Sequence, residues 1–338
     1  MAGEYILSEE ERLIIEILFG TQKLTKKHFS LINYEKIVKI SSSHLILPAL
    51  YINLERKKNL KYLPKDLCKY LTDIYEINKN RNKILIEESK EIASILDKNK
   101  VKYVFLKGTA HIHSKLYKNI GERMIGDIDL LVNQIDLKRA VLAIKNYGYK
   151  DIKYSFFENM HYTRQVNKNK TFAVEIHTKL LDRGKENIIY SNKFLNNSLN
   201  FQHISVPNLL NQFKHNIYNF QINDFGSNLL SYSYRSYYDN YMLNKAENIN
   251  LKKIKLDKYI RRYYLIIKLL KIPNINLINV SENKLDLFRF KCVYSSKLIY
   301  KINYLINRQL KLFPRQLIEL ILNKKYREYA LDKIKKND

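Results

Sequence analysis

The sequence is poor in the residues that interrupt helices and in those that build disulfide or zinc sites. Its 338 residues include only 8 glycines, 5 prolines and 2 cysteines, and no tryptophan. Scarce glycine and proline leave long stretches free to form helices. Cys68 and Cys292 lie far apart, so Cys-x-x-Cys zinc and thiol redox motifs are absent. Two isolated cysteines favour a reducing compartment, and we expect a cytoplasmic protein.

Motifs of several common enzyme classes are also missing. The chain has neither a Gly-x-Gly-x-x-Gly loop nor a Gly-x-x-x-x-Gly-Lys-Ser/Thr loop, the usual signatures of dinucleotide-binding and P-loop proteins. No Gly-x-Ser-x-Gly elbow marks a serine hydrolase. No apolar run approaches ~18 residues, and the first residues lack a basic segment followed by an apolar core. We therefore expect neither export nor membrane spanning.

Acidic residues are scarce relative to basic ones. The sequence has 60 Lys and Arg against 33 Asp and Glu, a formal net charge of +27 at pH 7. Clustered cations attract phosphates, so the charge favours a polyanionic partner such as a nucleic acid. A coding sequence biased towards A and T would enrich Lys, Ile, Asn and Tyr together and explains the same composition without a partner. The cations gathered near the C-terminus are Lys297, Lys301, Arg308, Lys311, Arg315, Lys324, Lys325 and Arg327.

What the sequence does contain is a pair of acids in a strand-like segment. Asp127 and Asp129 alternate with apolar residues within residues 127–132, and positions i and i+2 of a strand share a face. Two neighbouring carboxylates repel each other unless a cation lies between them, and oxygen ligands of this kind suit Mg²⁺ or Mn²⁺. A third acid, Glu175, lies in a second strand-like segment, residues 172–177, which would bring it up to the pair.

A glycine turn precedes the acid pair. The apolar run 101–106 predicts a buried strand, and Gly108 permits a tight turn into a helix over about residues 109–117. Free N–H groups at such a helix start favour a phosphate. Lys107 beside the turn either adds a positive charge to this site or is a surface lysine. Arg123 either pairs with one of the two aspartates or positions a triphosphate.

Three histidines and a tyrosine-rich segment allow two interpretations each. His177 either orients Glu175 or fills the core, and the pattern slightly favours the core. His111 and His113 fit packing or solvent positions better than ligand positions. The tyrosines of segment 229–238 either stack on a base or pack in the core, and their helical spacing favours packing.

Three regions are predicted from these patterns. Residues 1–98 form an N-terminal helical region that starts with a capping box at Ser8 and Glu11, ends in a long helix and helps to wall the cleft. Residues 99–182 hold the strands and all three acids. Residues 183–338 are helical again. We therefore expect an α+β fold, in which a small mixed sheet with its own helices is flanked by two helical regions.

The turn, the arginine and the two acid-bearing segments occur in an order that resembles a known family. They are Leu106-Lys107-Gly108, Tyr117, Arg123, residues 127–132 and residues 174–177. They resemble the largely uncharacterised nucleotidyltransferase family within the polymerase-β superfamily. A weaker resemblance continues from Pro207 to Leu243. The fold that this resemblance implies is a polymerase-β-like nucleotidyltransferase core.

The resemblance also implies roles for seven residues. The catalytic residues and ligands of two divalent ions, Mg²⁺ or Mn²⁺, would be Asp127, Asp129 and Glu175, with Glu175 either a metal ligand or a general base. The residues that cradle the triphosphate would be Lys107, Gly108, Thr109 and Arg123. Thr109 stands where many superfamily members carry a serine.

The activity implied is transfer of a nucleoside monophosphate from a nucleoside triphosphate (NTP), such as ATP, to an acceptor hydroxyl with release of pyrophosphate. A small molecule, an RNA end and a protein hydroxyl all satisfy this chemistry as acceptor. Two other hypotheses are a toxin-like enzyme that modifies RNA and a non-catalytic nucleotide-binding scaffold. Three convergent acids argue against the scaffold.

Overall fold

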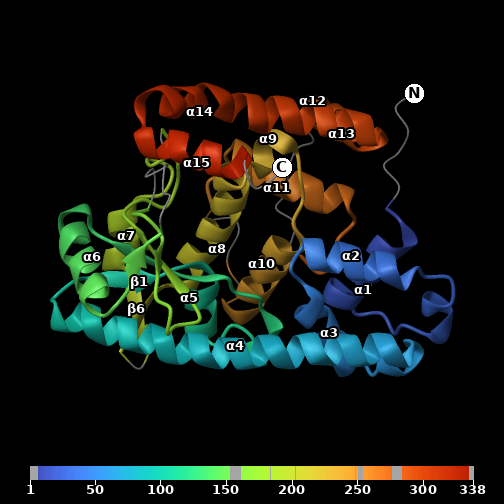
Figure 1. The fold of residues 1–338 in the computed structure, drawn as a ribbon. Coiled ribbons are helices and arrows are strands. Elements are labelled where there is room, and N and C mark those ends of the chain that lie inside the picture. Colours follow the sequence, from blue (N-terminus) through green and yellow to red (C-terminus); the bar gives the residue numbers. More distant parts are fainter. Residues whose placement is uncertain are drawn as a thin grey trace.

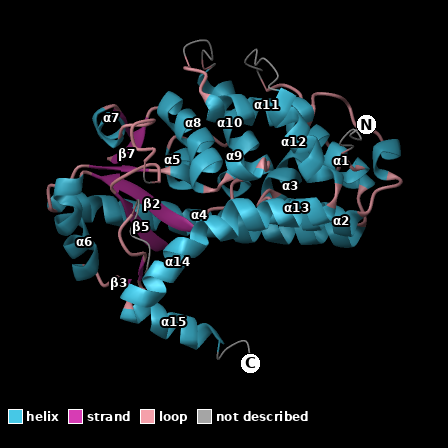
Figure 2. Cartoon of the chain, turned by 90° about the horizontal axis from the view of Figure 1, so that it is seen from above, coloured by secondary structure: helices cyan, strands magenta, loops and turns pink. Residues whose placement is uncertain are grey.

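The computed structural model describes residues 7–152, 161–182, 184–201, 203–247, 249, 254–275 and 284–334. Helices dominate these residues, and a small mixed sheet lies at one side of the molecule (Figure 2). The expected α+β class is therefore confirmed. Within the described ranges, no helix combines the length and the apolar character needed to cross a lipid bilayer.

The chain begins with a layer of short helices. Their bounds are α1 (Glu9–Phe19), η1 (Lys26–Phe29), α2 (Tyr34–Ser43), α3 (Leu47–Arg56) and η2 (Leu60–Tyr62). Helix α1 starts at the expected capping box, because Ser8 Oγ accepts a hydrogen bond from the Glu11 N–H at 3.4 Å. The Glu11 carboxylate in turn accepts one from the Ser8 N–H at 3.0 Å. Most residues of α1 and α3 are buried against their neighbours.

One long helix connects this layer to the rest of the molecule. Helix α4 (Lys65–Lys98) has 34 residues and runs along the bottom of the view in Figure 1. It contacts α3 on one side and α5 (Lys107–His113), α6 (Leu137–Asn146) and η3 (Ile120–Glu122) on the other. The N-terminal helices thus pack beside the sheet, as expected. The two boundaries between the three proposed regions stay predictions.

The main sheet has five strands in the order β1-β2-β5-β4-β3. Their bounds are β1 (Tyr103–Phe105), β2 (Asp127–Val132), β3 (Lys150–Asp151), β4 (Gln165–Val166) and β5 (Ala173–His177). Strand β2 is antiparallel to β1 and parallel to β5, and β4 is antiparallel to both β3 and β5. A parallel neighbour requires a crossover, which here includes η4 (Gln134–Asp136), α6 and the β3–β4 pair.

The remaining elements are mostly helical. They are α7 (Ser191–Asn196), β6 (Ser198–Phe201), β7 (Ile204–Pro207), α8 (Leu209–Tyr218), η5 (Asn219–Asn223), α9 (Gly226–Leu229), α10 (Tyr234–Glu247), α11 (Lys258–Leu269), α12 (Lys284–Ser295), α13 (Lys297–Tyr304), η7 (Leu305–Gln309), α14 (Leu310–Leu322) and α15 (Lys324–Ile334). Helix α8 packs against both α10 and α5. Tyr234, Tyr237 and Tyr238 are buried, so these three tyrosines pack in the core as their spacing predicted.

Candidate active site

The pairing of β2 with β5 brings the predicted acids together. In the parallel register Asp129 is the partner of Glu175, and Leu131 is the partner of His177. Asp127 lies two residues before Asp129 on β2 and lines the same cavity. The expectation that a second strand carries Glu175 up to the aspartates is therefore confirmed.

Three of these side chains offer a cluster of metal-binding atoms. One ligand atom each from Asp129, Glu175 and His177 lies within 4.8 Å of the others, and all three side chains are largely buried. His177 Nε2 is 2.8 Å from Asp129 Oδ1 and 3.8 Å from Glu175 Oε2. Carboxylates suit Mg²⁺ or Mn²⁺, and an imidazole is a common ligand of transition metals. The donor set therefore fits one divalent ion whose remaining ligands are water or substrate.

Asp127 lies outside this cluster. Its carboxylate accepts a hydrogen bond from Nη2 of Arg164, the residue before β4. The Asp127 side chain is 26% exposed and lines the cavity next to Asp129. Asp127 could bind a metal ion only if the ion displaced Arg164 from its carboxylate. Its role as a metal ligand stays a prediction.

Lys107 neutralises the central acid. Its Nζ lies 2.6 Å from Asp129 Oδ1. Burial alone would raise the pKa of Asp129, but the positive charge of Lys107 and the hydrogen bond from His177 outweigh it and hold this pKa below its ordinary value. The pKa of Glu175 is raised instead, first by burial and then by the negative charge of Asp129. One carboxylate is thus held ionised while its neighbour is the better proton acceptor.

His177 is both a core residue and part of the acid cluster. It is buried, as the favoured interpretation of the sequence expects, yet it contacts Asp129. Burial lowers the pKa of His177 to about 4, although its hydrogen bond with Asp129 opposes the change. A neutral imidazole can donate one N–H to Asp129 and keep a lone pair on its other nitrogen.

The turn before α5 differs in detail from the expectation. Helix α5 ends at His113 instead of near residue 117, because Lys115 adopts a left-handed conformation with φ 52°. Lys107 itself has φ 50°. A Cβ on Gly108 would lie 2.7 Å from Ile125 Cγ1, so this position requires glycine. The positive charge beside the acids therefore comes mainly from the Lys107 side chain and not from the N–H groups at the start of this short helix.

Thr109 does not line the cavity that contains the acids. It is wholly buried, and its hydroxyl has no hydrogen-bond partner in the described part of the chain. The predicted contact between this hydroxyl and a phosphate stays a prediction, one that would require the turn to move.

Arg123 is paired with an acid that the sequence did not point to. Its Nε donates to Asp239 Oδ1 at 2.9 Å and Oδ2 at 3.1 Å, and Tyr117 OH donates to the same carboxylate. The Arg123 carbonyl accepts hydrogen bonds from the side-chain amides of Asn78 and Asn82 on α4. The alternative in which Arg123 pairs with an aspartate of β2 is therefore wrong.

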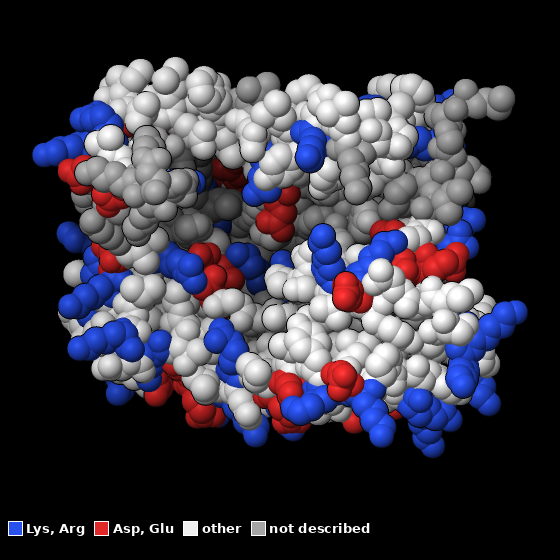
Figure 3. Space-filling model, turned by 45° about the vertical axis from the view of Figure 1, so that its right-hand side comes forward, with Lys and Arg blue, Asp and Glu red and all other residues white. Residues whose placement is uncertain are grey.

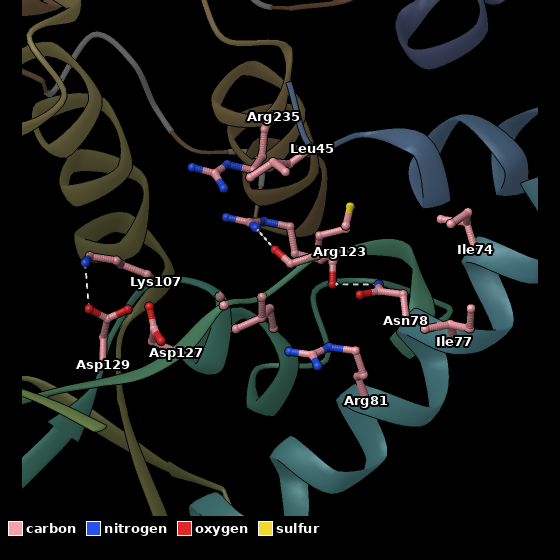
Figure 4. A pocket seen from close by; sticks show the side chains of 14 residues that line it. Leu45, Ile74, Ile77, Asn78, Arg81, Lys107, Arg123, Asp127, Asp129 and Arg235 are labelled. Carbon is pink, nitrogen blue, oxygen red and sulfur yellow. Dashed lines mark hydrogen bonds and ion pairs between the residues drawn. The ribbon is translucent and has the colours of Figure 1, made fainter. Parts of the chain in front are cut away.

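Several of these residues line one cavity of about 520 Å³ (Figure 4), whereas Thr109, Glu175, His177 and Asp239 do not line it. Its charged end contains Lys107, Asp127, Asp129, Arg123 and Arg235. Figure 4 shows the guanidinium groups of Arg123 and Arg235 near one another, on the same side of the cavity as the Lys107–Asp129 pair.

Away from the Lys107–Asp129 pair the cavity is mostly apolar. Ile74 and Ile77 line that end with Asn78 and Arg81, whereas Leu45 lies beside Arg235 (Figure 4). Met124 and Ile125 also line the cavity. Ile77 is 57% exposed and Leu45 is 39% exposed, which is unusual for large apolar side chains that have a core available to them. The N-terminal region thus walls the cavity, as expected.

The C-terminal cations form no comparable site. Lys301, Arg308, Lys324 and Arg327 are exposed, and the side chains of Lys297, Lys311, Arg315 and Lys325 lie outside the described set. Arg327 Nη1 donates to the carbonyls at the end of α14, and the Arg308 guanidinium lies 5.3 Å from the Tyr304 ring centroid. On the face in Figure 3, basic and acidic side chains are interspersed. The hypothesis of nucleic-acid binding therefore depends on net charge alone.

Comparison with known families agrees with the geometry. A family model described as an uncharacterised nucleotidyltransferase matches residues 30–251. The match covers every side chain of the charged and apolar ends of the cavity, together with Glu175, His177 and Asp239. None of the curated proteins compared with the chain matches it.

Proposed function

The chain belongs to the uncharacterised nucleotidyltransferase family, and we propose that it transfers a nucleoside monophosphate from an NTP to an acceptor hydroxyl and releases pyrophosphate. One observation carries the proposal. The register of β2 and β5 sets Glu175 beside Asp129, and Asp129 lines a cavity together with Lys107 and Arg123. Paired carboxylates next to cations suit metal-assisted phosphoryl chemistry.

The two aspartates would hold Mg²⁺ or Mn²⁺. Asp129 already lies with Glu175 and His177 in one cluster, and Asp127 would join Asp129 as a ligand when Arg164 releases it. In this proposal Glu175 serves as the base and His177 as a hydrogen-bond donor, so neither binds the ion. When bound, the ion offsets phosphate charge and lowers the pKa of the attacking hydroxyl. His177 would keep the Asp129 carboxylate in place through its 2.8 Å hydrogen bond.

The cavity would receive the NTP lengthwise. Lys107 and Arg123 at the charged end would bind the triphosphate, and the lack of a side chain on Gly108 lets the backbone approach it closely. The base would lie along Ile74 and Ile77 at the mostly apolar end. Contact with apolar side chains gives little discrimination between bases, so several NTPs are expected to serve as donors.

The reaction then needs one proton acceptor and one stabilised leaving group. The acceptor oxygen forms a bond to the α-phosphorus while the bond from that phosphorus to the bridging oxygen breaks. The hydroxyl proton goes to Glu175, whose raised pKa makes it a better base than an ordinary carboxylate. The electron pair stays with pyrophosphate, and Lys107 and Arg123 stabilise its charge.

Transfer of label tests this proposal. Wild-type protein is incubated with each α-labelled NTP and Mg²⁺ or Mn²⁺, with total RNA, protein and small-molecule extract of the source cells as separate acceptors. We expect label in one fraction, absent when a chelator is added. Label in RNA would favour the toxin-like hypothesis over a small-molecule acceptor. Absence of label from all three fractions with every NTP and both ions would contradict the proposal.

A further inference from the structure

Arg235 is a cavity residue that the proposed reaction does not yet use. It is the second residue of α10, next to the buried Tyr234, and it lines the charged end of the cavity together with Arg123. Within the described ranges, no hydrogen bond and no ion pair of 4.0 Å or less joins its guanidinium to another residue. Its donors are therefore available to a ligand.

The surroundings of Arg235 contain a second partly free guanidinium. Arg123 donates through Nε to Asp239 and through Nη1 to the Met124 carbonyl, which leaves Nη2 without a partner among the described residues. The positive charge of Arg123 is the main reason why the pKa of Arg235 lies below its ordinary value, and burial is the second. Two converging cations in a cavity are stabilised by an anion between them.

Nearby acids do not supply that anion. Asp239 is held by Arg123 and Tyr117. Asp224 lines a small adjoining cavity with Arg235 and Lys107, but it is more than 4.0 Å from either cation. Asp224 is therefore a competitor for Arg235 and not its partner in this state.

A phosphate group fits these donors best. Guanidinium groups bind phosphate oxygens through paired N–H donors, and two of them are suited to an anion with several oxygens. Because Lys107, Asp127 and Asp129 line the same cavity, the anion would lie next to these groups. We propose that Arg235 and Arg123 together grip the β- and γ-phosphates, the part of the NTP that leaves as pyrophosphate; this assignment rests on the proposed function.

Binding of inorganic pyrophosphate tests the site without any acceptor. Calorimetric titrations in Mg²⁺ buffer compare wild type with Arg235→Gln, Arg235→Lys and Arg139→Gln. We expect Arg235→Gln to raise the Kd at least about tenfold and Arg235→Lys to raise it less, since lysine keeps the charge but loses the paired N–H donors. Arg139, which is exposed, pairs with Asp136 and does not line the cavity, is the control and should change the Kd less than about twofold.

A substitution at Asp224 should change the affinity for pyrophosphate in the opposite direction. Asp224→Asn removes the anion that competes for Arg235, so the affinity for pyrophosphate should rise. Equal losses in Arg235→Gln and Arg139→Gln, a weaker affinity in Asp224→Asn, or no pyrophosphate binding by the wild type would overturn the inference. Circular dichroism of each variant shows whether it is folded, and Arg235→Lys replaces Arg235→Gln if the latter is not.

The two proposals fail separately. If pyrophosphate binding depends on Arg235 but no fraction acquires label, the anion site stands and the transfer reaction does not. If label is transferred while Arg235→Gln leaves both the Kd for pyrophosphate and the KM for NTP unchanged, the reaction stands and the role of Arg235 does not.

Discussion

Lys107 Nζ lies 2.6 Å from Asp129 Oδ1, so the chain itself supplies a cation to the acid at the centre of its acid cluster. Asp129 also accepts a hydrogen bond from His177, and its side chain is only 11% exposed. A buried carboxylate is costly without such partners. A divalent ion at this cluster would share Asp129 with Lys107 and would be repelled by the ammonium group.

Lys107→Met should therefore tighten the binding of the metal alone. Removing the ammonium takes away a positive charge beside the ion, and we expect the Kd for Mn²⁺ to fall by about fivefold to tenfold, or about 1 kcal/mol. Electron paramagnetic resonance of free Mn²⁺ measures this Kd. Lys102→Met is the control, because Lys102 is exposed and donates to Asn196. A Kd that rises in Lys107→Met would show that Lys107 does not oppose the ion.

Asp239→Asn should destabilise the fold. Asp239 is 1% exposed and binds both Arg123 and Tyr117, so the variant leaves the buried guanidinium without its counter-ion. Removing one partner of a buried ion pair lowers the free energy of unfolding by about 3 kcal/mol. Chemical denaturation measures the free energy of unfolding. Asp73→Asn, at an exposed pair with Lys69, should change it by less than about 0.5 kcal/mol, and similar effects of the two substitutions would contradict the account.

Gly108→Ala should weaken NTP binding through Ile125. The added Cβ would lie 2.7 Å from Ile125 Cγ1, so the turn or the isoleucine must shift. We expect the Kd for NTP to rise at least about tenfold, the equivalent of 1.4 kcal/mol. The double variant Gly108→Ala/Ile125→Ala should recover part of the affinity, and an unchanged Kd in Gly108→Ala alone would place the phosphates elsewhere.

The stability of the protein should fall as the pH drops below about 6.5. Burial lowers the pKa of His44 and His113 to about 4, whereas an unfolded histidine titrates near 6.5. Between these values the unfolded state binds more protons, so the free energy of unfolding decreases with decreasing pH. Denaturation at pH 4.5 to 8 measures the slope. His113→Gln, which can keep a hydrogen bond to Ser89, should reduce it, and a stability independent of pH over this range would contradict the burial of these rings.

Local patterns predicted much of the fold. The i, i+2 spacing of Asp127 and Asp129, the strand that carries Glu175 and the long helix after Pro64 all depend on residues close together in the sequence. Side-chain periodicity and capping report such elements directly. The alternation predicts which face each acid shares, but it does not fix the parallel direction or the register of β2 and β5, which depend on how the chain crosses between them.

The pairing of the arginines could not be predicted in this way. Arg123 binds Asp239, 116 positions away, and Arg164 binds Asp127, 37 positions away. Such pairs depend on how the helices and strands pack, which no local spacing records. Arg235 lies within a tyrosine-rich segment. The spacing of the tyrosines indicates which side of the helix is buried, but it does not indicate that Arg235 lines the cavity.

The central claim is that Asp129 is the main metal-binding carboxylate of a nucleotidyl-transfer site. The most direct measurement compares the initial rate of label transfer from an α-labelled NTP by wild type, Asp129→Asn and Asp136→Asn, with Mg²⁺ or Mn²⁺ and the acceptor fraction that becomes labelled. Asp136, at the start of α6, pairs with Arg139 and does not line the cavity. We predict that Asp129→Asn lowers the rate at least about a hundredfold, or ~3 kcal/mol of transition-state stabilisation, while Asp136→Asn keeps it within about twofold. A near-normal rate in folded Asp129→Asn would contradict the account.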